Sequence, residues 1–298
     1  MNKNILILLS FVGLWTSSVV SENYENILGL FLIISFGILH GSNDILLLKE
    51  NVKTDFTKAS QSKIIFIYVL CILVIICSFY LIPKITLLVF ILISAYHFGE
   101  QHLYEKLNGT PSILKHSLHL SYGCTVLIGL LLLNIKQVHK IIFSISTFNL
   151  QSQHLIILLT LSASLLISVL AYCTYKKWVP IPDLIYEILI ATVLFIIFNV
   201  STLIWGFAIY FIFWHSLPSL NDQIKYVYGN TNSENVKNYV LKALPYWAVS
   251  IAGLIVFYFI LKDDKLLYAI LFSFIAAITF PHAFVIYKTF KHEKTLPN

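Results

Sequence analysis

Apolar residues in this chain come in long runs separated by short polar segments. A helix needs about 20 apolar residues to cross the hydrocarbon core of a bilayer, and most of the runs approach that length. The pattern predicts an all-α protein with about ten transmembrane helices in one domain, residues 1–298, because no linker or internal repeat interrupts it. The predicted spans lie near residues 4–20, 27–48, 64–82, 85–104, 116–133, 155–175, 183–200, 201–220, 245–261 and 266–287.

Short polar or helix-breaking segments set the boundaries between neighbouring spans. Pro83 separates the third span from the fourth, and residues 262–265 separate the ninth from the tenth. The seventh and eighth spans together form 35 mostly apolar residues, too many for one helix, and they are interrupted only by Asn199, Ser201 and Thr202. The longest polar stretch, 221–242, predicts a cytoplasmic loop that contains one short amphipathic helix.

The first apolar run has two interpretations. Lys3 followed by apolar residues 4–20 is also typical of a secretory signal peptide. No cleavage site of small residues follows, so we expect a first transmembrane helix.

Composition supports a membrane protein and excludes several functions. The chain is 58% hydrophobic and 11% charged, too few charges to cover the surface of a soluble domain of 298 residues. All 20 basic residues are lysine, and arginine is the residue preferred for bidentate phosphate recognition. The net charge of +6 therefore does not indicate nucleic-acid binding. The four cysteines lie in apolar segments without a CxxC spacing, which favours inert buried thiols.

Lysines also predict the orientation of the chain. Fifteen of the 20 lysines lie at one set of span ends and five at the opposite set. Because cytoplasmic ends carry the excess of positive charge, we expect both termini in the cytoplasm and the protein in the cell (inner) membrane.

Four histidines lie within apolar spans, where an ionisable side chain is costly and marks a functional site by default. They are His40, His97, His215 and His282, in the second, fourth, eighth and tenth predicted spans. Each precedes the next lysine toward the cytoplasm by six to ten residues, which places all four imidazoles roughly 9–15 Å below the cytoplasmic surface. An isolated histidine in a span is more often an interhelical hydrogen-bonding group, but four at one depth predict a metal site between helices.

The other six histidines have less informative positions. His102, His116 and His119 lie near the cytoplasmic interface, His139 and His154 in the outer loop, and His292 in the tail. Solvated or capping roles are common at such places.

Two carboxylates accompany the histidines. Asp44 follows His40 by four residues and Glu100 follows His97 by three, so each is expected on the helix face of its histidine. Carboxylates near metal-bound imidazoles accept their second ring N–H and fix the tautomer, which predicts this outer role for Asp44 and Glu100. Imidazole ligands suit zinc, copper, iron and nickel, and an all-histidine set favours ferrous iron that awaits dioxygen or zinc with a bound hydroxide.

The motifs around the four histidines are HGSND, HFGE, FWHSL and PHAFV. In this order they resemble the Brp/Blh family of β-carotene-cleaving dioxygenases, membrane enzymes that supply retinal to microbial rhodopsins. The resemblance implies ferrous iron held by His40, His97, His215 and His282, and cleavage of the central double bond of β-carotene by O₂ to give two retinals. Some members carry a second histidine four residues after the one in the eighth span, where this chain has Ser219, so the place of His282 in the ligand set stays open.

Aromatic residues gather around these motifs and would suit a polyene substrate, although most aromatics in membrane proteins pack helices or anchor interfaces. The candidates for lining a substrate tunnel are Tyr96, Phe98, Phe211, Trp214, Phe280 and Phe284.

Two other functions use buried histidines in membranes. Lipid desaturases hold two irons with HxxxH and HxxHH boxes, whereas His116 and His119 form only an HxxH and no HxxHH exists. A transporter of divalent metal ions would use the same four histidines as stepping stones. Its pathway would favour residues staggered along the membrane normal rather than gathered in one layer.

Overall fold

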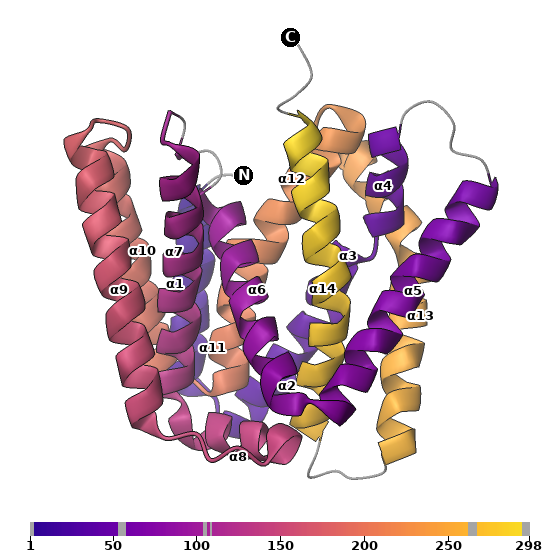
Figure 1. Cartoon of the computed structure of the whole chain (residues 1–298), viewed down its shortest axis with the longest axis horizontal. Helices are drawn as coiled ribbons and strands as arrows, with labels where there is room; N and C mark the ends of the chain where they lie inside the picture. The colour runs from indigo at the N-terminus through magenta and orange to yellow at the C-terminus, as the bar shows by residue number, and fades with distance from the viewer. Residues whose placement is uncertain (1–2, 53–57, 104–105, 108, 262–266, 294–298) are drawn as a thin grey trace. The chain divides into compact units, whose positions relative to one another are not determined.

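The computed structural model describes residues 3–52, 58–103, 106–107, 109–261 and 267–293. Every regular element in these ranges is helical, as the sequence predicts, and two elements are π-helices, labelled η1 and η2 (Figure 1). The chain divides into two compact units. Unit 1 comprises Met1–Ile33, Ile91–Phe143 and Thr147–Ser216, and unit 2 comprises Ile34–Phe90, Ser144–Ser146 and Leu217–Asn298. The organisation of the chain as one membrane domain stays a prediction.

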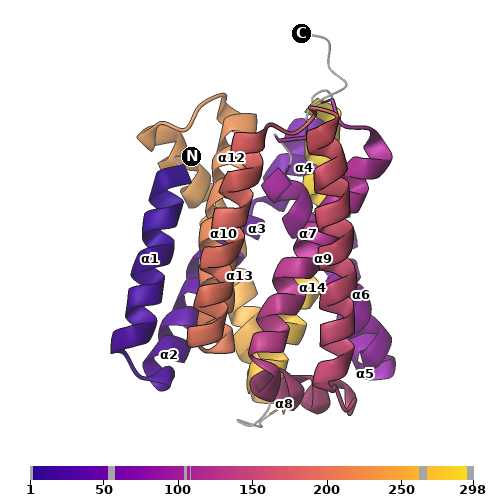
Figure 2. The same cartoon turned by 90° about the vertical axis from the view of Figure 1, so that its left-hand side faces the viewer.

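Unit 1 contains the helices of the N-terminal and central parts of the chain. They are α1 (Lys3–Val19), α2 (Glu22–Leu32), α6 (Pro83–Leu103) from Ile91 onward, α7 (Ser112–Leu133), α8 (Ile135–Ser146) as far as Phe143, α9 (Ser152–Tyr175), α10 (Ile181–Val200), α11 (Leu203–Ile209) and η2 (Tyr210–Ser216). Helices α7 and α9 pack along their length, and α8 crosses their ends (Figures 1 and 2). The segment predicted as an outer loop thus contains a helix, α8, that crosses these ends.

The turn between α10 and α11 is held by buried polar contacts within unit 1. The carboxylate of Glu25, only 3% exposed, accepts a hydrogen bond from the backbone N–H of Thr202 at 2.8 Å. The indole N–H groups of Trp205 and Trp214 donate to the Gly13 carbonyl and the Ser10 hydroxyl of α1. These bonds fix α11 and η2 against the first two helices.

Unit 2 contains the remaining helices. They are η1 (Ile33–Gly37) from Ile34 onward, α3 (Ile38–Gly41), α4 (Asp44–Val52), α5 (Lys58–Leu81), α6 as far as Phe90, α12 (Leu217–Tyr228), α13 (Ser233–Leu261) and α14 (Leu267–Glu293). Helix α14 packs against α5 and α4, and α13 packs against α3. A small core of Leu47, Val285 and Ile286 joins α4 to α14.

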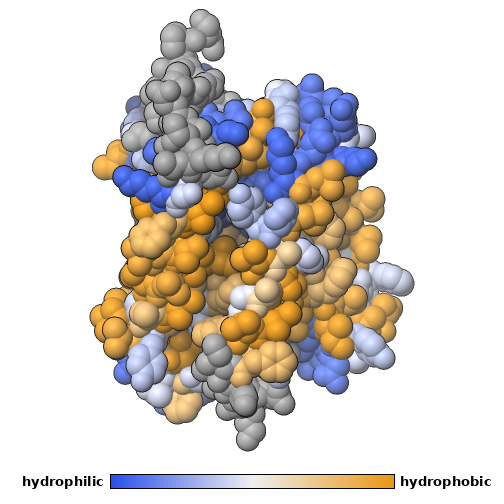
Figure 3. Space-filling model, turned by 90° about the vertical axis from the view of Figure 1, so that its right-hand side faces the viewer, coloured by the Kyte–Doolittle hydropathy of each residue, from blue (hydrophilic) through white to orange (hydrophobic). Residues whose placement is uncertain are grey.

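Large apolar side chains cover the outward faces of α5 and α13. Phe66, Leu73, Val74, Val249 and Phe259 are each about half exposed or more. Figure 3 shows this face as a broad hydrophobic area, with most of the hydrophilic residues gathered toward one end. Because apolar surface is unfavourable in water and favourable in an apolar environment, the face is suited to contact with lipid tails.

Eight helical segments in the described residues are long and apolar enough to cross a membrane. They are Glu22–Glu50, Ser62–Leu81, Ser112–Leu133, Ser152–Tyr175, Ile181–Val200, Leu203–Tyr228, Ser233–Phe259 and Ala269–Phe290. Helices also occupy the other two predicted spans, as α1 and α6, but they are not among the eight. The protein is therefore a multi-pass helical membrane protein, and the count of ten spans and their orientation stay predictions.

The predicted boundaries can be compared with the helix ends. Helix α5 ends at Leu81 and α6 begins at Pro83, which confirms the first break. The division of the long apolar run is also confirmed, since α10 ends at Val200 and α11 begins at Leu203. The expected loop at 221–242 is largely helical instead, with α12 and α13 separated only by 229–232. The predicted turn at 262–265 lies outside the described residues.

Candidate metal centre

Two of the four predicted ligands lie together in unit 2. His40 ends the short helix α3, and His282 lies in the middle of α14, directly after Pro281. Their ring centroids are 4.8 Å apart with the rings nearly perpendicular, at 84°. Both side chains are buried, with 4% and 3% of their surface exposed. Two helices thus bring a pair of imidazoles into edge-to-face contact.

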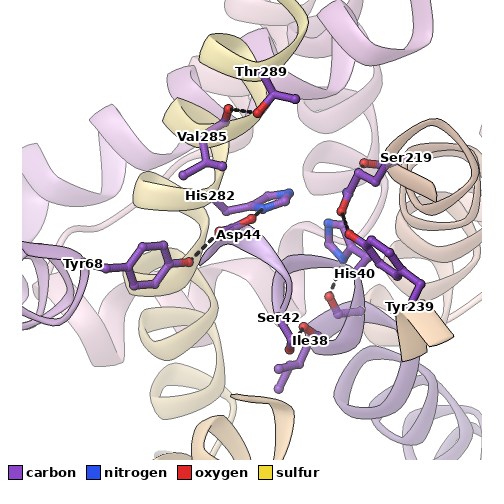
Figure 4. Close-up of polar contacts among 12 residues, drawn as sticks. Ile38, His40, Ser42, Asp44, Tyr68, Ser219, Tyr239, His282, Val285 and Thr289 are labelled. Atoms are coloured by element: carbon purple, nitrogen blue, oxygen red, sulfur yellow. Dashed lines mark hydrogen bonds and ion pairs between the residues drawn. The ribbon is translucent and has the colours of Figure 1, made fainter. Parts of the chain in front are cut away.

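Each imidazole of this pair is anchored through the same ring nitrogen. Nδ1 of His40 contacts the carbonyl oxygen of Gly37, and Nδ1 of His282 lies 2.7 Å from Oδ1 of Asp44 (Figure 4). A carbonyl or carboxylate oxygen accepts a hydrogen bond, so Nδ1 carries the hydrogen in both rings. Nε2 is then the nitrogen with a lone pair for a metal ion, which is the usual arrangement around metal-ligating histidines. The chemistry of this pair therefore fits a metal ion.

Asp44 reaches His282 because the backbone turns immediately before it. Helix α3 ends at Gly41, Ser42 and Asn43 form a turn, and Asp44 begins α4. The helical register that the sequence suggested between His40 and Asp44 is therefore interrupted. The carboxylate, 2% exposed, contacts the histidine of α14, while a backbone carbonyl anchors His40.

A fully buried polar network adjoins His40 in unit 2 (Figure 4). The amide of Asn43 donates to the backbone carbonyl of Tyr239, and the Tyr239 hydroxyl donates to the side-chain oxygen of Gln223. The amide nitrogen of Gln223 donates to the Ser219 hydroxyl at 2.8 Å. Ser219 is thus part of a hydrogen-bonded network.

The other two predicted ligands lie together in unit 1. His97 of α6 and His215 of η2 have ring centroids 4.8 Å apart, at 75°. Both are buried, with 2% and 1% of their surface exposed. Phe98 lies 4.4 Å from the His215 ring, and Phe211 stacks on that ring at 5.6 Å. Two predicted lining residues thus cover this histidine pair with apolar surface.

Close packing of α6 on α7 fixes the position of His97. A Cβ atom on Gly99 would lie 1.9 Å from the carbonyl oxygen of His119, and one on Gly123 would lie 1.8 Å from that of Ala95. Only glycine fits at such backbone contacts, which are common between membrane helices. His97 lies between Ala95 and Gly99 in the sequence. The two backbone contacts, one on each side of it, therefore hold this part of α6 against α7.

Tyr96 of α6 contacts Glu100 on its own helix and two histidines of α7. The Tyr96 hydroxyl is 2.6 Å from Nδ1 of His116 and 3.5 Å from a carboxylate oxygen of Glu100. The Tyr96 ring meets that of His119 edge to face at 5.7 Å. His119 is buried rather than solvated, with 6% of its surface exposed.

The remaining predicted lining residues have varied surroundings. Trp214 is buried and donates its indole N–H to Ser10. In unit 2, Phe280 stacks on Phe90 at 6.4 Å, and Phe284 is 65% exposed.

A second ionisable cluster in unit 1 was not anticipated. Glu187 of α10 accepts a hydrogen bond from Nε2 of His102 at 2.7 Å and another from the ammonium group of Lys106. Tyr122 stacks on the His102 ring at 4.5 Å. Of the solvated or capping roles expected for His102, the solvated one does not apply, because its side chain is only 6% exposed. No spacing in the sequence links Glu187 to His102, since they come from different helices.

π-Helices precede or contain two of the four histidines. Segment η1 ends at Gly37, three residues before His40, and η2 contains His215. Such wide turns are rare in proteins and are frequent at functional sites. Within unit 2, His40 and His282 are buried side chains of a kind that could bind a metal ion.

Long apolar helices and buried imidazoles define a multi-pass membrane protein with candidate metal ligands. The chain belongs to the β-carotene 15,15'-dioxygenase family, whose model matches residues 31–289. The matched region contains all four histidines and Asp44. No curated protein and no solved structure matches the chain. Membership in this family identifies the protein as an enzyme and implies cleavage of β-carotene.

Proposed function

We propose that this protein is an iron-dependent dioxygenase that cleaves the central double bond of β-carotene with O₂. One carotene and one O₂ give two retinals, each with a new aldehyde oxygen at the cleaved bond. The observation that carries the proposal is the pair His40 and His282, both anchored through Nδ1 and both presenting Nε2, in a chain of this family.

The proposed ligands are His40, His97, His215 and His282. Each unit supplies one pair with ring centroids 4.8 Å apart. The common depth of the four residues in the sequence is the reason to propose that both pairs serve one ion. The anchors of the unit 2 pair would hold the Nδ1 hydrogens in place, which fixes the tautomer that ligation requires.

Ferrous iron suits a set of imidazole ligands without an anionic member. When bound, iron would supply the activation of dioxygen, while the protein holds the substrate and excludes water. Asp44 would offset part of the charge of the ion through His282. Glu100 is proposed in a similar outer role on the unit 1 side.

The substrate is an insoluble hydrocarbon that resides among lipid tails, so a centre at bilayer depth can receive it without extraction into water. Phe98 and Phe211 contact His215 directly and would form an apolar wall beside the target double bond. Binding the polyene against such walls would hold the reacting bond in a fixed position. The remaining proposed lining residues are Tyr96, Trp214, Phe280 and Phe284.

The lysine distribution supports an inner-membrane location with both termini in the cytoplasm. A retinal-binding rhodopsin in the same membrane would be the receiver of the product.

Expression in a bacterial host that accumulates β-carotene tests the proposal. We expect loss of the orange colour, appearance of retinal in the extract, and iron in the purified protein. The His282→Ala variant should leave the host orange, whereas Tyr80→Phe, a change at a residue 88% exposed, should not. Unchanged carotene together with altered uptake of divalent ions would instead favour a metal transporter.

A further inference from the structure

Tyr68 is a partly buried polar residue of α5, a helix whose apolar side chains mostly face outward. It lies in α5, where its neighbours Phe66, Ile67, Val69 and Leu70 are all exposed. The Tyr68 ring is partly buried and packs against the small core that joins α4 to α14. Helix α5 thus presents apolar side chains outward and this phenol inward.

The hydroxyl of Tyr68 binds the carboxylate of Asp44, which also anchors His282. It donates a hydrogen bond to Oδ2 of Asp44 at 2.7 Å, while Oδ1 of the same carboxylate accepts from Nδ1 of His282 at 2.7 Å. Figure 4 shows the three side chains in a row, from α5 through α4 to α14. Both carboxylate oxygens are therefore engaged, each by a different helix.

We propose that Tyr68 is a positioning residue that orients His282 through Asp44, an inference that rests on the proposed function. A carboxylate held at one oxygen can still rotate about its side-chain bonds. A second hydrogen bond at the other oxygen leaves one orientation, and that orientation directs Oδ1 at Nδ1 of His282. Tyr68 would thereby hold His282 in the orientation that lets Nε2 bind an ion, without itself touching the ion or the substrate.

The position of the Tyr68 hydroxyl favours a role in orienting Asp44 over a role confined to the packing of α5. The Ser78 hydroxyl of α5 donates a hydrogen bond to the Val74 carbonyl of its own helix. The Tyr68 hydroxyl lies too far from its own backbone to do so, and its acceptor belongs to another helix, α4. The acceptor here is a buried carboxylate, and hydrogen bonds to ionised groups are the strong ones.

Anaerobic titration of the detergent-solubilised, metal-free protein with ferrous ion tests the inference. Tyr68→Phe removes only the hydroxyl and keeps the packed ring. We expect it to weaken ferrous binding by about 10-fold, since loss of outer hydrogen-bond partners of metal ligands costs 10–100-fold. Tyr80→Phe, on the same helix and 88% exposed, is the matched control and should bind as the wild type does. Thermal unfolding of the metal-free proteins reports any general loss of stability.

A double-variant cycle separates positioning from general damage. If Tyr68 acts through Asp44, then Tyr68→Phe should have little further effect on ferrous affinity in an Asp44→Asn background. The visible spectrum of bound cobalt(II) should also shift in Tyr68→Phe, because the orientation of one ligand changes. Unchanged affinity in Tyr68→Phe, or the same loss in both backgrounds, would overturn the inference while leaving the proposed function intact. A wild-type protein that binds neither ion would overturn both.

Discussion

The imidazole of His282 donates its Nδ1 hydrogen to Oδ1 of Asp44 across 2.7 Å, although 238 positions separate the two residues in the chain. This contact joins the first turn of α4 to the middle of α14. Both side chains are buried, so water does not compete for the bond. An ordinary surface pair would contribute little, whereas a buried bond to a charged acceptor is costly to lose.

Replacement of Asp44 by asparagine should weaken iron binding by about 10–100-fold, because a neutral amide oxygen is a poorer acceptor for the N–H of a metal-bound imidazole. Anaerobic ferrous titration measures the effect. Asp183→Asn, in the first turn of α10, is the control and should bind normally. If the Asp44→Asn variant bound ferrous ion as tightly as the wild type, Asp44 would contribute only to the stability of the fold.

Removal of the His97 imidazole should lower iron content and retinal production together, since we propose it as a ligand. Elemental analysis of the purified His97→Ala variant gives the first quantity and product analysis the second. His139→Ala changes a histidine of α8 and should retain both. A full complement of iron in His97→Ala would exclude His97 from the ligand set.

A methyl group on Gly99 should separate α6 from α7, because its Cβ would lie 1.9 Å from the backbone oxygen of His119. We expect Gly99→Ala to lower stability by about 1–3 kcal/mol, the usual cost of overpacking, and to lower iron content through the shift of His97. Unfolding in a denaturing detergent measures the stability. Gly253→Ala is the matched change, since its Cβ would meet only Phe274 at 3.8 Å. Equal stability of both variants would contradict the backbone contact.

Loss of the Glu187 carboxylate should destabilise unit 1, since it leaves Lys106 and His102 buried beside each other without a counter-charge. Removing one partner of a buried ion pair costs about 3–5 kcal/mol, and Glu187→Ala should approach the lower figure because Lys106 is 13% exposed. The same detergent unfolding applies. Glu234→Ala, in the exposed first turn of α13, should have little effect, and equal behaviour of the two variants would argue against the ion pair.

The burial of the four histidines was accessible from the sequence because all four lie within apolar spans, and span length and lysine positions further predict a common depth for them. The depth of a residue in the membrane does not reveal in which direction its side chain points around the helix axis. The sequence could therefore nominate His40, His97, His215 and His282 as one layer, but not that His40 meets His282 and His97 meets His215. Those pairings depend on which helices are neighbours, a property of tertiary packing.

Tyr68 and the orientation of Asp44 were inaccessible for a different reason. Helix α5 is apolar on all sides, so no periodic pattern indicates which face turns inward. Asp44 follows a turn that the apolar run conceals, and the spacing rule for an unbroken helix assigned it to the face of His40. The aromatic candidates show the same limit, since composition near a motif does not distinguish Phe98 beside His215 from Trp214 bonded to Ser10.

The wide turns at η1 and η2 make the histidine positions sensitive to insertion and deletion. A π-helical turn accommodates an extra residue, and each residue advances a helix by about 100°. Deleting one residue within Tyr210–Ser216 could convert η2 to regular α-helix and change the phase of every side chain that follows. A homologue with such a deletion would keep the same hydropathy profile and the same histidine motif while losing the alignment of that imidazole. Alignments of this family should therefore be examined for the length of these two segments as well as for the residues in them.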